Sequence, residues 1–284
     1  MNGEYERLRR AARDLIETDR VLAGETLAPG AQLPEMSAPA SRPERPARTP
    51  APAKSSAPGP AAPAGGGRAG RQRVPPVKLK GLSDEARRKQ AELEAIDTGE
   101  VRGCTKCGLC RGRTHTVFGE GRPDADVFFI GEGPGEEEDR QGRPFVGRAG
   151  ELLSKMIAAM GLTRADVYIG NVVKCRPPNN RAPSAEEAQA CWDYLLRQLR
   201  IIAPKVIVTM GNPATHALLN TTVGITRLRG QWQSLPMLDA DLAGIKVMPT
   251  FHPAFVLRSY TADNRGKVWS DLQEVMRELG LKKA

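Results

Sequence analysis

The stretch Asp126-Val127-Phe128-Phe129-Ile130-Gly131 is a continuous apolar run that ends on a glycine, and it sets the architecture of the folded part. Consecutive apolar residues without polar alternation are typical of a strand buried on both faces of a parallel sheet. Three later segments have the same character and predict three further strands: 167–173, 205–211 and 245–250, the last with Pro249 marking its end.

Helical patterns separate these strands. Ser83 can cap a helix over 84–97, and Ser184 with Glu187 forms a capping box that opens a helix reaching Ile202. Three further segments also predict helices: 149–160, 213–219 and 263–279. Apolar strands that alternate with helices indicate an α/β fold in which a mostly parallel sheet is covered on both faces.

The first part of the chain has a different composition. Residues 34–80 contain 11 prolines and nine Lys or Arg against two Asp or Glu, so this stretch holds most of the chain's net charge of +9. Such a segment cannot bury enough apolar surface to offset its entropy. We therefore expect three regions in 284 residues: a short amphipathic helix within 1–27, a disordered Pro/Ala/Gly-rich basic tether over 28–82, and one folded domain over 83–284. A basic arm suits loose phosphate contacts or a solvated spacer, and its composition does not separate the two.

The compartment follows from what the sequence lacks. Residues 1–27 carry acidic residues between short apolar steps and do not resemble a signal peptide, and no run reaches the ~18 apolar residues that span a bilayer. We expect a cytoplasmic protein without membrane contact, in a compartment where thiols stay reduced.

Five cysteines are spaced like ligands of a metal centre. Cys104, Cys107 and Cys110 are separated by two residues each, and Cys175 and Cys191 follow 65 and 16 positions later. Thiolates separated by two residues can bind one metal centre, although free buried cysteines are the plainer interpretation. Zinc and an iron–sulfur cluster both fit four thiolates, and the spacing does not separate them.

Ligands of parallel α/β sheets bind beyond the carboxyl ends of the strands, so the strand ends are the place for a site. The first strand leads into Gly131–Asp139, which is glycine-rich but lacks the Gly-x-Gly-x-x-Gly order of a dinucleotide fold. The four acids that follow Gly135 would also repel a pyrophosphate. No Gly-x-x-x-x-Gly-Lys-Ser/Thr phosphate loop is present. The other three strands lead into Asn171, 210–212 and 251–255.

Four side chains near these ends are each ambiguous alone. His252 could be structural, Glu132 could cap local amides, Phe145 could be core, and Asn171 could bond backbone groups. Together at one edge of the sheet, these four side chains could bind a ligand with a polar aromatic ring. They offer a face to stack on, an amide to read an edge, a proton donor and a carboxylate.

With these residues in place, the chain resembles the family 4, iron–sulfur branch of the uracil-DNA glycosylase superfamily. The resemblance covers about 100–260 and rests on several separate motifs in order: GEGPGEEED at 131–139, GRPFVG at 142–147, NVVKCRPP at 171–178 and HPAF at 252–255. It implies a three-layer α/β/α sandwich with a central four-stranded parallel sheet, preceded by the disordered arm.

The resemblance also implies a cofactor and partners. A 4Fe–4S cluster would be held by Cys104, Cys107, Cys175 and Cys191, with Cys110 as an additional thiol. The partner would be uracil-containing DNA, single- or double-stranded, bound by a monomer whose N-terminal arm could engage a repair or replication protein.

The activity implied is removal of a flipped uracil by hydrolysis of its N-glycosidic bond, which leaves an abasic site. Phe145 would stack on the base, with Asn171 on its edge and the Gly133 backbone beside it. His252 would donate to uracil O2, and Glu132 would orient water or stabilise the sugar cation. By position, 256–258 would wedge into the base stack and hold a phosphate. The competing hypothesis is a non-catalytic DNA-binding or scaffold module with a four-cysteine zinc site.

Overall fold

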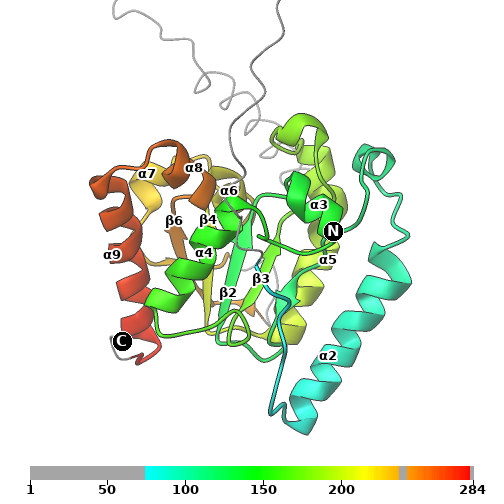
Figure 1. Cartoon of the computed structure of the whole chain (residues 1–284), viewed down its shortest axis with the longest axis horizontal. Helices are drawn as coiled ribbons and strands as arrows, with labels where there is room; N and C mark the ends of the chain where they lie inside the picture. The colour runs from blue at the N-terminus through cyan, green and yellow to red at the C-terminus, as the bar shows by residue number, and fades with distance from the viewer. Residues whose placement is uncertain (1–73, 237–241, 282–284) are drawn as a thin grey trace, which may run out of the picture.

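The computed structural model describes residues 74–236 and 242–281, and within them it shows a six-stranded sheet in the order β1-β3-β2-β4-β6-β5 (Figure 1). The four predicted strands form its parallel centre, which confirms the predicted sheet. Two strands of two residues each, β1 and β5, extend it antiparallel at the edges and were not predicted. The bounds are β1 Glu120–Gly121, β2 Val127–Gly131, β3 Tyr168–Asn171, β4 Val206–Met210, β5 Gln233–Ser234 and β6 Lys246–Thr250.

Alternate residues of the central strands point into two separate apolar layers. Phe128 and Ile130 pack on one face of the sheet, while Val127 and Phe129 pack on the other. The first face is covered by α2 (Asp84–Ile96), α5 (Ala185–Ile202) and α6 (Asn212–Leu219). The second is covered by α4 (Arg148–Ala159), α7 (Ile225–Leu228), α8 (Pro253–Arg258) and α9 (Ala262–Glu278). The three-layer α/β/α sandwich is thereby confirmed.

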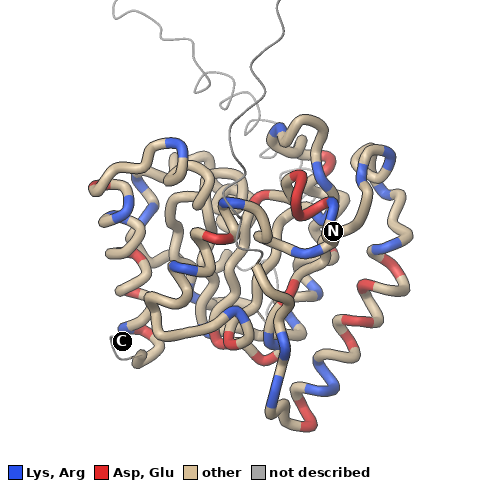
Figure 2. The backbone as a smooth tube through the Cα atoms, viewed as in Figure 1, with Lys and Arg blue, Asp and Glu red and all other residues tan. Residues whose placement is uncertain are grey.

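The predicted caps are present. Ser83 accepts a hydrogen bond from the amide of Ala86 at 3.1 Å, and Ser184 and Glu187 form the reciprocal capping box that opens α5. Helix α2 continues into a π-helical turn, Asp97–Val101, that delivers the chain to the cysteine loop. Figure 2 shows acidic and basic residues mixed along α2, as expected for a helix that buries only one narrow face.

The N-terminal predictions fall largely outside the described residues, which begin at Val74. Residues 74–82, assigned above to the tether, already contact the domain. Val74 is 8% exposed, and Arg143 donates hydrogen bonds to the carbonyls of Val74 and Pro75 at 3.1 and 2.8 Å. The contacts of the domain therefore start nine residues before the predicted boundary. No helix in 74–236 or 242–281 is long and apolar enough to span a membrane.

Candidate active site

The carboxyl ends of the four parallel strands open into a cleft of about 640 Å³. Five residues predicted for catalysis or substrate binding all line it, although they come from four separate segments of the chain: Glu132, Gly133, Phe145, Asn171 and His252. The structure thus brings together what the sequence could only place near a common edge. Their individual roles remain predictions.

Phe145 lies close to both His252 and Asn171, and the part of the cleft that these three side chains line is called the slot below. The rings of Phe145 and His252 have centroids 5.7 Å apart with planes inclined by 35°. A Cβ placed on Gly131 would lie 2.5 Å from both Asn171 Oδ1 and Phe145 Cζ. Because any side chain at position 131 would collide with both, only glycine lets the amide and the aromatic ring approach this closely.

Asn171 presents an unpaired acceptor. The residue is 1% exposed, and its Oδ1 is buried without a hydrogen-bond partner among the described residues. Buried polar atoms are normally paired, since leaving one unpaired costs about 1–3 kcal/mol. Because Asn171 also lines the cleft, a bound ligand could supply the missing hydrogen-bond donor.

His252 is held in one tautomer. Its Nδ1 accepts a hydrogen bond from the amide of Ala254 at 3.1 Å, so the proton of the neutral ring is on Nε2. Burial, reinforced by the positive charge of Arg258, lowers the pKa of His252 to about 4. At neutral pH the residue is therefore an uncharged imidazole that can donate one hydrogen bond.

The glycine-rich turn after β2 packs against the Cys175 loop. The amide of Val173 donates to the carbonyl of Glu132 at 3.1 Å, and a Cβ on Gly133 would lie 2.7 Å from Val173 Cγ2. Gly133 therefore allows close contact between two loops that border the cleft. The turn and the Cys175 loop form one packed unit.

Glu138, on α3 (Glu136–Gln141), is a cleft residue that the sequence patterns did not single out. Its Oε1 accepts hydrogen bonds from the amides of Val146 and Gly147, both at 2.8 Å, and so fixes the backbone immediately after Phe145. The signal was present in the run of acids at 136–139, but the sequence does not say which of the four faces inward.

The structure contradicts part of the predicted wedge segment, and the phosphate-binding role of Arg258 stays a prediction. Arg258 does line the cleft, but Val256 is 2% exposed and packs in the core, so it cannot enter a base stack. Phe255, 37% exposed at the cleft, is the large apolar residue of this helix that faces outward. Asn212, from the segment 210–212 that was expected at this edge, lines the cleft, and so does Arg181, which was not predicted.

All five cysteines line a second, small cavity next to the Cys175 loop. Cys175 and Cys191 are buried, whereas Cys104, Cys107 and Cys110 are partly exposed. No group of three or more His, Cys, Asp or Glu in 74–236 and 242–281 is arranged so that it could hold a metal ion as it stands. The loop, the Cys175 turn and α5 nevertheless bring their thiols to one place, as the spacing predicted.

The surroundings of this cavity disfavour free thiolates but would tolerate thiolates bound to a cationic centre. Burial raises the pKa of Cys175 to about 11 and also raises that of Cys191, so isolated thiolates are disfavoured there. A bound cationic centre would reverse that preference, because thiols deprotonate when they bind a metal. Arg113 Nη1 lies 3.3 Å from Cys175 Sγ, so the guanidinium of Arg113 offsets negative charge at the cavity. The donor chemistry therefore fits a thiolate-bound cofactor.

Comparison with known proteins agrees with this fold and cleft. Residues 118–273 match the family model of the uracil DNA glycosylase superfamily, a class of α/β proteins. The chain is 48% identical over 187 residues to a type-4 uracil-DNA glycosylase of Thermotoga maritima, a match that covers 64% of this chain and 93% of the relative. It is 42% identical over 198 residues to the type-4 enzyme of Archaeoglobus fulgidus, covering 67% and 96% respectively. The chain belongs to the type-4 uracil-DNA glycosylases.

Proposed function

We propose that this chain, a DNA repair glycosylase by its family, excises uracil by binding the flipped base between Phe145, Asn171 and His252. A base inside a duplex is out of reach of a recessed cleft, so it must be extruded before reaction. The observation that carries this proposal is the unpaired, buried Oδ1 of Asn171 beside the Phe145 ring.

Asn171 explains the choice of base. Uracil carries an N3–H donor and an O4 acceptor, whereas cytosine carries a bare N3 and an exocyclic amine. The Oδ1 of Asn171 pairs with N3–H of uracil, and with cytosine it would stay unpaired in the buried slot. A polar site that is left unpaired by the wrong substrate discriminates strongly.

His252 and Glu132 serve the bond cleavage. Breaking the N-glycosidic bond moves negative charge onto uracil O2 and positive charge onto the sugar. The Nε2–H of neutral His252 donates to O2, and one such donor is worth about 3 kcal/mol in comparable oxyanion sites. Glu132, at the turn beside Gly133, orients water or stabilises the sugar cation.

For the cofactor, we propose that Cys104, Cys107, Cys175 and Cys191 hold a 4Fe–4S cluster and that Cys110 is an additional thiol. When bound, the cluster supplies a structural cross-link between three segments that are distant in sequence. The chain's own residues then fix the Cys175 loop, whose other contacts lead through Val173 to Glu132 and the cleft.

The remaining predictions about partners stay part of this proposal. The chain acts as a monomer in the cytoplasm, and its N-terminal arm engages a repair or replication partner. The net positive charge of residues 34–80 supports a role beside DNA, where phosphate contacts need no fixed structure.

The direct test is incubation with single- and double-stranded oligonucleotides that contain one uracil, followed by alkali to cleave abasic sites. We expect cleavage at uracil and none at cytosine in matched strands. His252→Ala should lose most of the activity while its circular dichroism spectrum matches that of the wild type. Equal cleavage by the wild-type protein of strands with and without uracil would contradict the proposal.

A further inference from the structure

The backbone of Phe145 is in an unfavourable conformation. Its φ is 51°, in the left-handed region that bulky side chains rarely adopt. Such a conformation is unfavourable and persists only where its surroundings hold it. Glu138 binds the two amides that follow Phe145, but these hydrogen bonds do not involve the carbonyl groups of Pro144 and Phe145.

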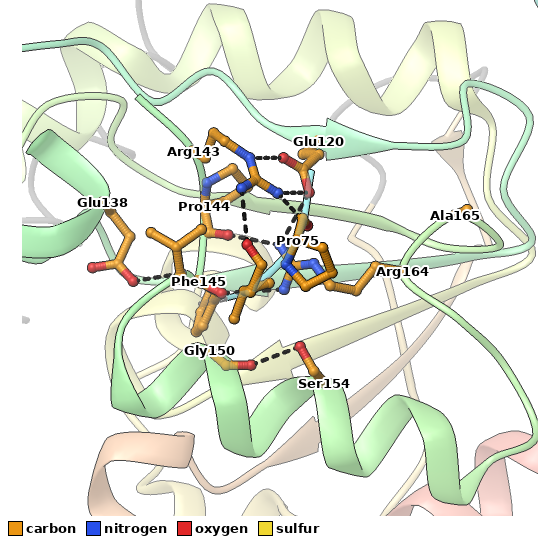
Figure 3. Close-up of polar contacts among 12 residues, drawn as sticks. Pro75, Glu120, Glu138, Arg143, Pro144, Phe145, Gly150, Ser154, Arg164 and Ala165 are labelled. Carbon is orange, nitrogen blue, oxygen red and sulfur yellow. Dashed lines mark hydrogen bonds and ion pairs between the residues drawn. The ribbon is translucent and has the colours of Figure 1, made fainter. Parts of the chain in front are cut away.

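Arg164 binds both of these carbonyls. Its Nη1 donates to the carbonyl of Phe145 at 3.1 Å, and its Nη2 donates to the carbonyl of Pro144 at 2.8 Å (Figure 3). Arg164 comes from the connection between α4 and β3, nineteen residues along the chain from Phe145. It is 9% exposed and does not line the cleft, so it contacts the loop from behind.

The guanidinium of Arg164 is itself held by a partly buried carboxylate. Its Nη2 lies 3.3 Å from Glu120 Oε1, and Arg143 pairs with the same carboxylate at 2.5 Å, as Figure 3 shows. The Glu120 side chain is 14% exposed. Arg143 and Arg164 share this one carboxylate, and Arg164 Nε has no hydrogen-bond partner among the described residues. Burying a guanidinium in this way is costly, and a residue that only filled space would avoid that cost. Burial lowers the pKa of Arg164, and Glu120 opposes that shift.

We propose that Arg164, held by Glu120, is a positioning residue for uracil excision. It keeps Phe145 in the left-handed conformation that directs the ring into the slot beside Asn171. The inference rests on the proposed stacking role of Phe145. Arg164 would act through the geometry of that ring and not through any contact with DNA.

Helix α4 supports the same interpretation. A Cβ on Gly150 would lie 1.8 Å from the carbonyl oxygen of Phe145, so this carbonyl is pressed against the first turns of the helix. The close approach prevents the peptide from moving toward the helix, and Arg164 donates a hydrogen bond to the same carbonyl oxygen (Figure 3). The two contacts together fix the peptide.

A double-mutant cycle tests the inference, using single-turnover excision from a uracil oligonucleotide with enzyme in excess. We compare the wild type, Arg164→Met, Phe145→Ala and the double variant, with a melting curve for each. If Arg164 acts through Phe145, Arg164→Met slows excision on the order of 10- to 100-fold in the wild-type background. In the Phe145→Ala background the same change should slow excision less than about twofold, because coupled residues are not additive.

Two further variants keep the test decisive. Arg164→Lys retains the charge but cannot bind two carbonyls with a rigid fork, so it should recover only part of the rate. Arg122→Met removes another partly buried arginine beside β1, one that pairs with Asp124, and should change the rate less than about twofold. If Arg164→Met does not fold, Arg164→Lys and Glu120→Gln replace it in the cycle.

The outcomes separate the two levels of the argument. Equal slowing by Arg164→Met in both backgrounds, or none in the wild type, overturns the positioning role and leaves the proposed function intact. If Phe145→Ala alone excises uracil at the wild-type rate, the stacking role fails, and the inference fails with it.

Discussion

At the scale of single residues, Asn171 has a side chain whose unpaired acceptor costs stability and is proposed to serve base recognition. Its unpaired, buried Oδ1 costs stability in the free protein, and under the proposed function it would gain a partner in the N3–H of uracil. We therefore predict that Asn171→Ala lowers kcat/KM for uracil on the order of 10²-fold or more. The free energy of unfolding should change by less than about 1 kcal/mol, as measured by urea denaturation.

A neighbour on the same strand provides the matched control. Ile169 is fully buried in the second apolar layer, and Ile169→Ala should cost about 2–5 kcal/mol of stability by leaving a cavity. A loss of stability at Asn171 as large as that at Ile169 would contradict the view that the amide serves the ligand.

The pKa of His252 predicts a pH dependence. Because the folded pKa is about 4 and the ordinary value is 6.5, the residue stays neutral in the folded protein above about pH 5. The single-turnover rate should therefore show no ionisation of His252 between about pH 5 and 8. A break near pH 6.5 that disappears in His252→Gln would contradict this.

The sign of the linked stability follows from the same shift. Between about pH 4 and 6.5 the unfolded chain binds a proton at His252 that the folded protein does not. Its contribution to the free energy of unfolding thus rises as the pH increases through that window. Urea denaturation of the wild type and of His252→Gln at several pH values would measure the difference.

At the scale of elements, the helix α4 contains a glycine whose substitution should have an inverted effect. Replacing a mid-helix glycine with alanine usually stabilises by about 0.5–1 kcal/mol. Gly150→Ala should instead destabilise the protein and slow excision, because the new Cβ would collide with the Phe145 carbonyl. Gly266→Ala in α9 is the control and should stabilise, since a Cβ at that position would meet no atom within 4 Å. Urea denaturation compares the two.

The sequence predicts the central elements well because their patterns are local. Each of the four parallel strands is a run of apolar residues, and the predicted bounds fall within about two residues of the observed ones. The edge strands β1 and β5 have two residues each and no apolar pattern, so they exist only through their pairing with β3 and β6. The helices α3 and α7 were not predicted either, because they are too short to show a helical repeat of apolar residues.

The sequence predicts several of the residues that meet at the cleft, but it does not predict the contacts that hold them in place. Gly131, Asn171 and His252 are marked by their places at strand ends, where the parallel topology brings them together. The positive φ of Phe145 and its bonds to Arg164 depend on contacts between distant segments, and no local pattern encodes them.

At the scale of the whole molecule, the cysteine cavity joins the cysteine loop, the Cys175 turn and α5. We predict that Cys191→Ser loses bound iron and acid-labile sulfide and lowers the melting temperature, because the cross-link between these segments is lost. Cys110→Ser should keep its iron and sulfide, since it lies outside the proposed ligand set. Retention of the full iron content by Cys191→Ser, or its loss in Cys110→Ser, would contradict that set.

The basic arm predicts an effect on affinity that is separate from catalysis. A protein that begins at Val74 lacks most of the positive charge of residues 34–80. Its binding to DNA should be weaker at low salt and should depend less steeply on salt, as measured by fluorescence anisotropy. Under single-turnover conditions at saturating enzyme its excision rate should equal that of the full chain. An unchanged salt slope would show that the arm is only a spacer.

The cleft takes its walls from four strands, and β6, which leads into His252, is the last of them along the chain. The segments that carry Phe145 and Asn171 precede β6 in the chain, so the cleft is complete only when β6 has paired with β4 and brought His252 to the edge of the sheet. We therefore expect a variant that weakens the pairing of β6 with β4 to lose the cleft even if the other three parallel strands stay paired.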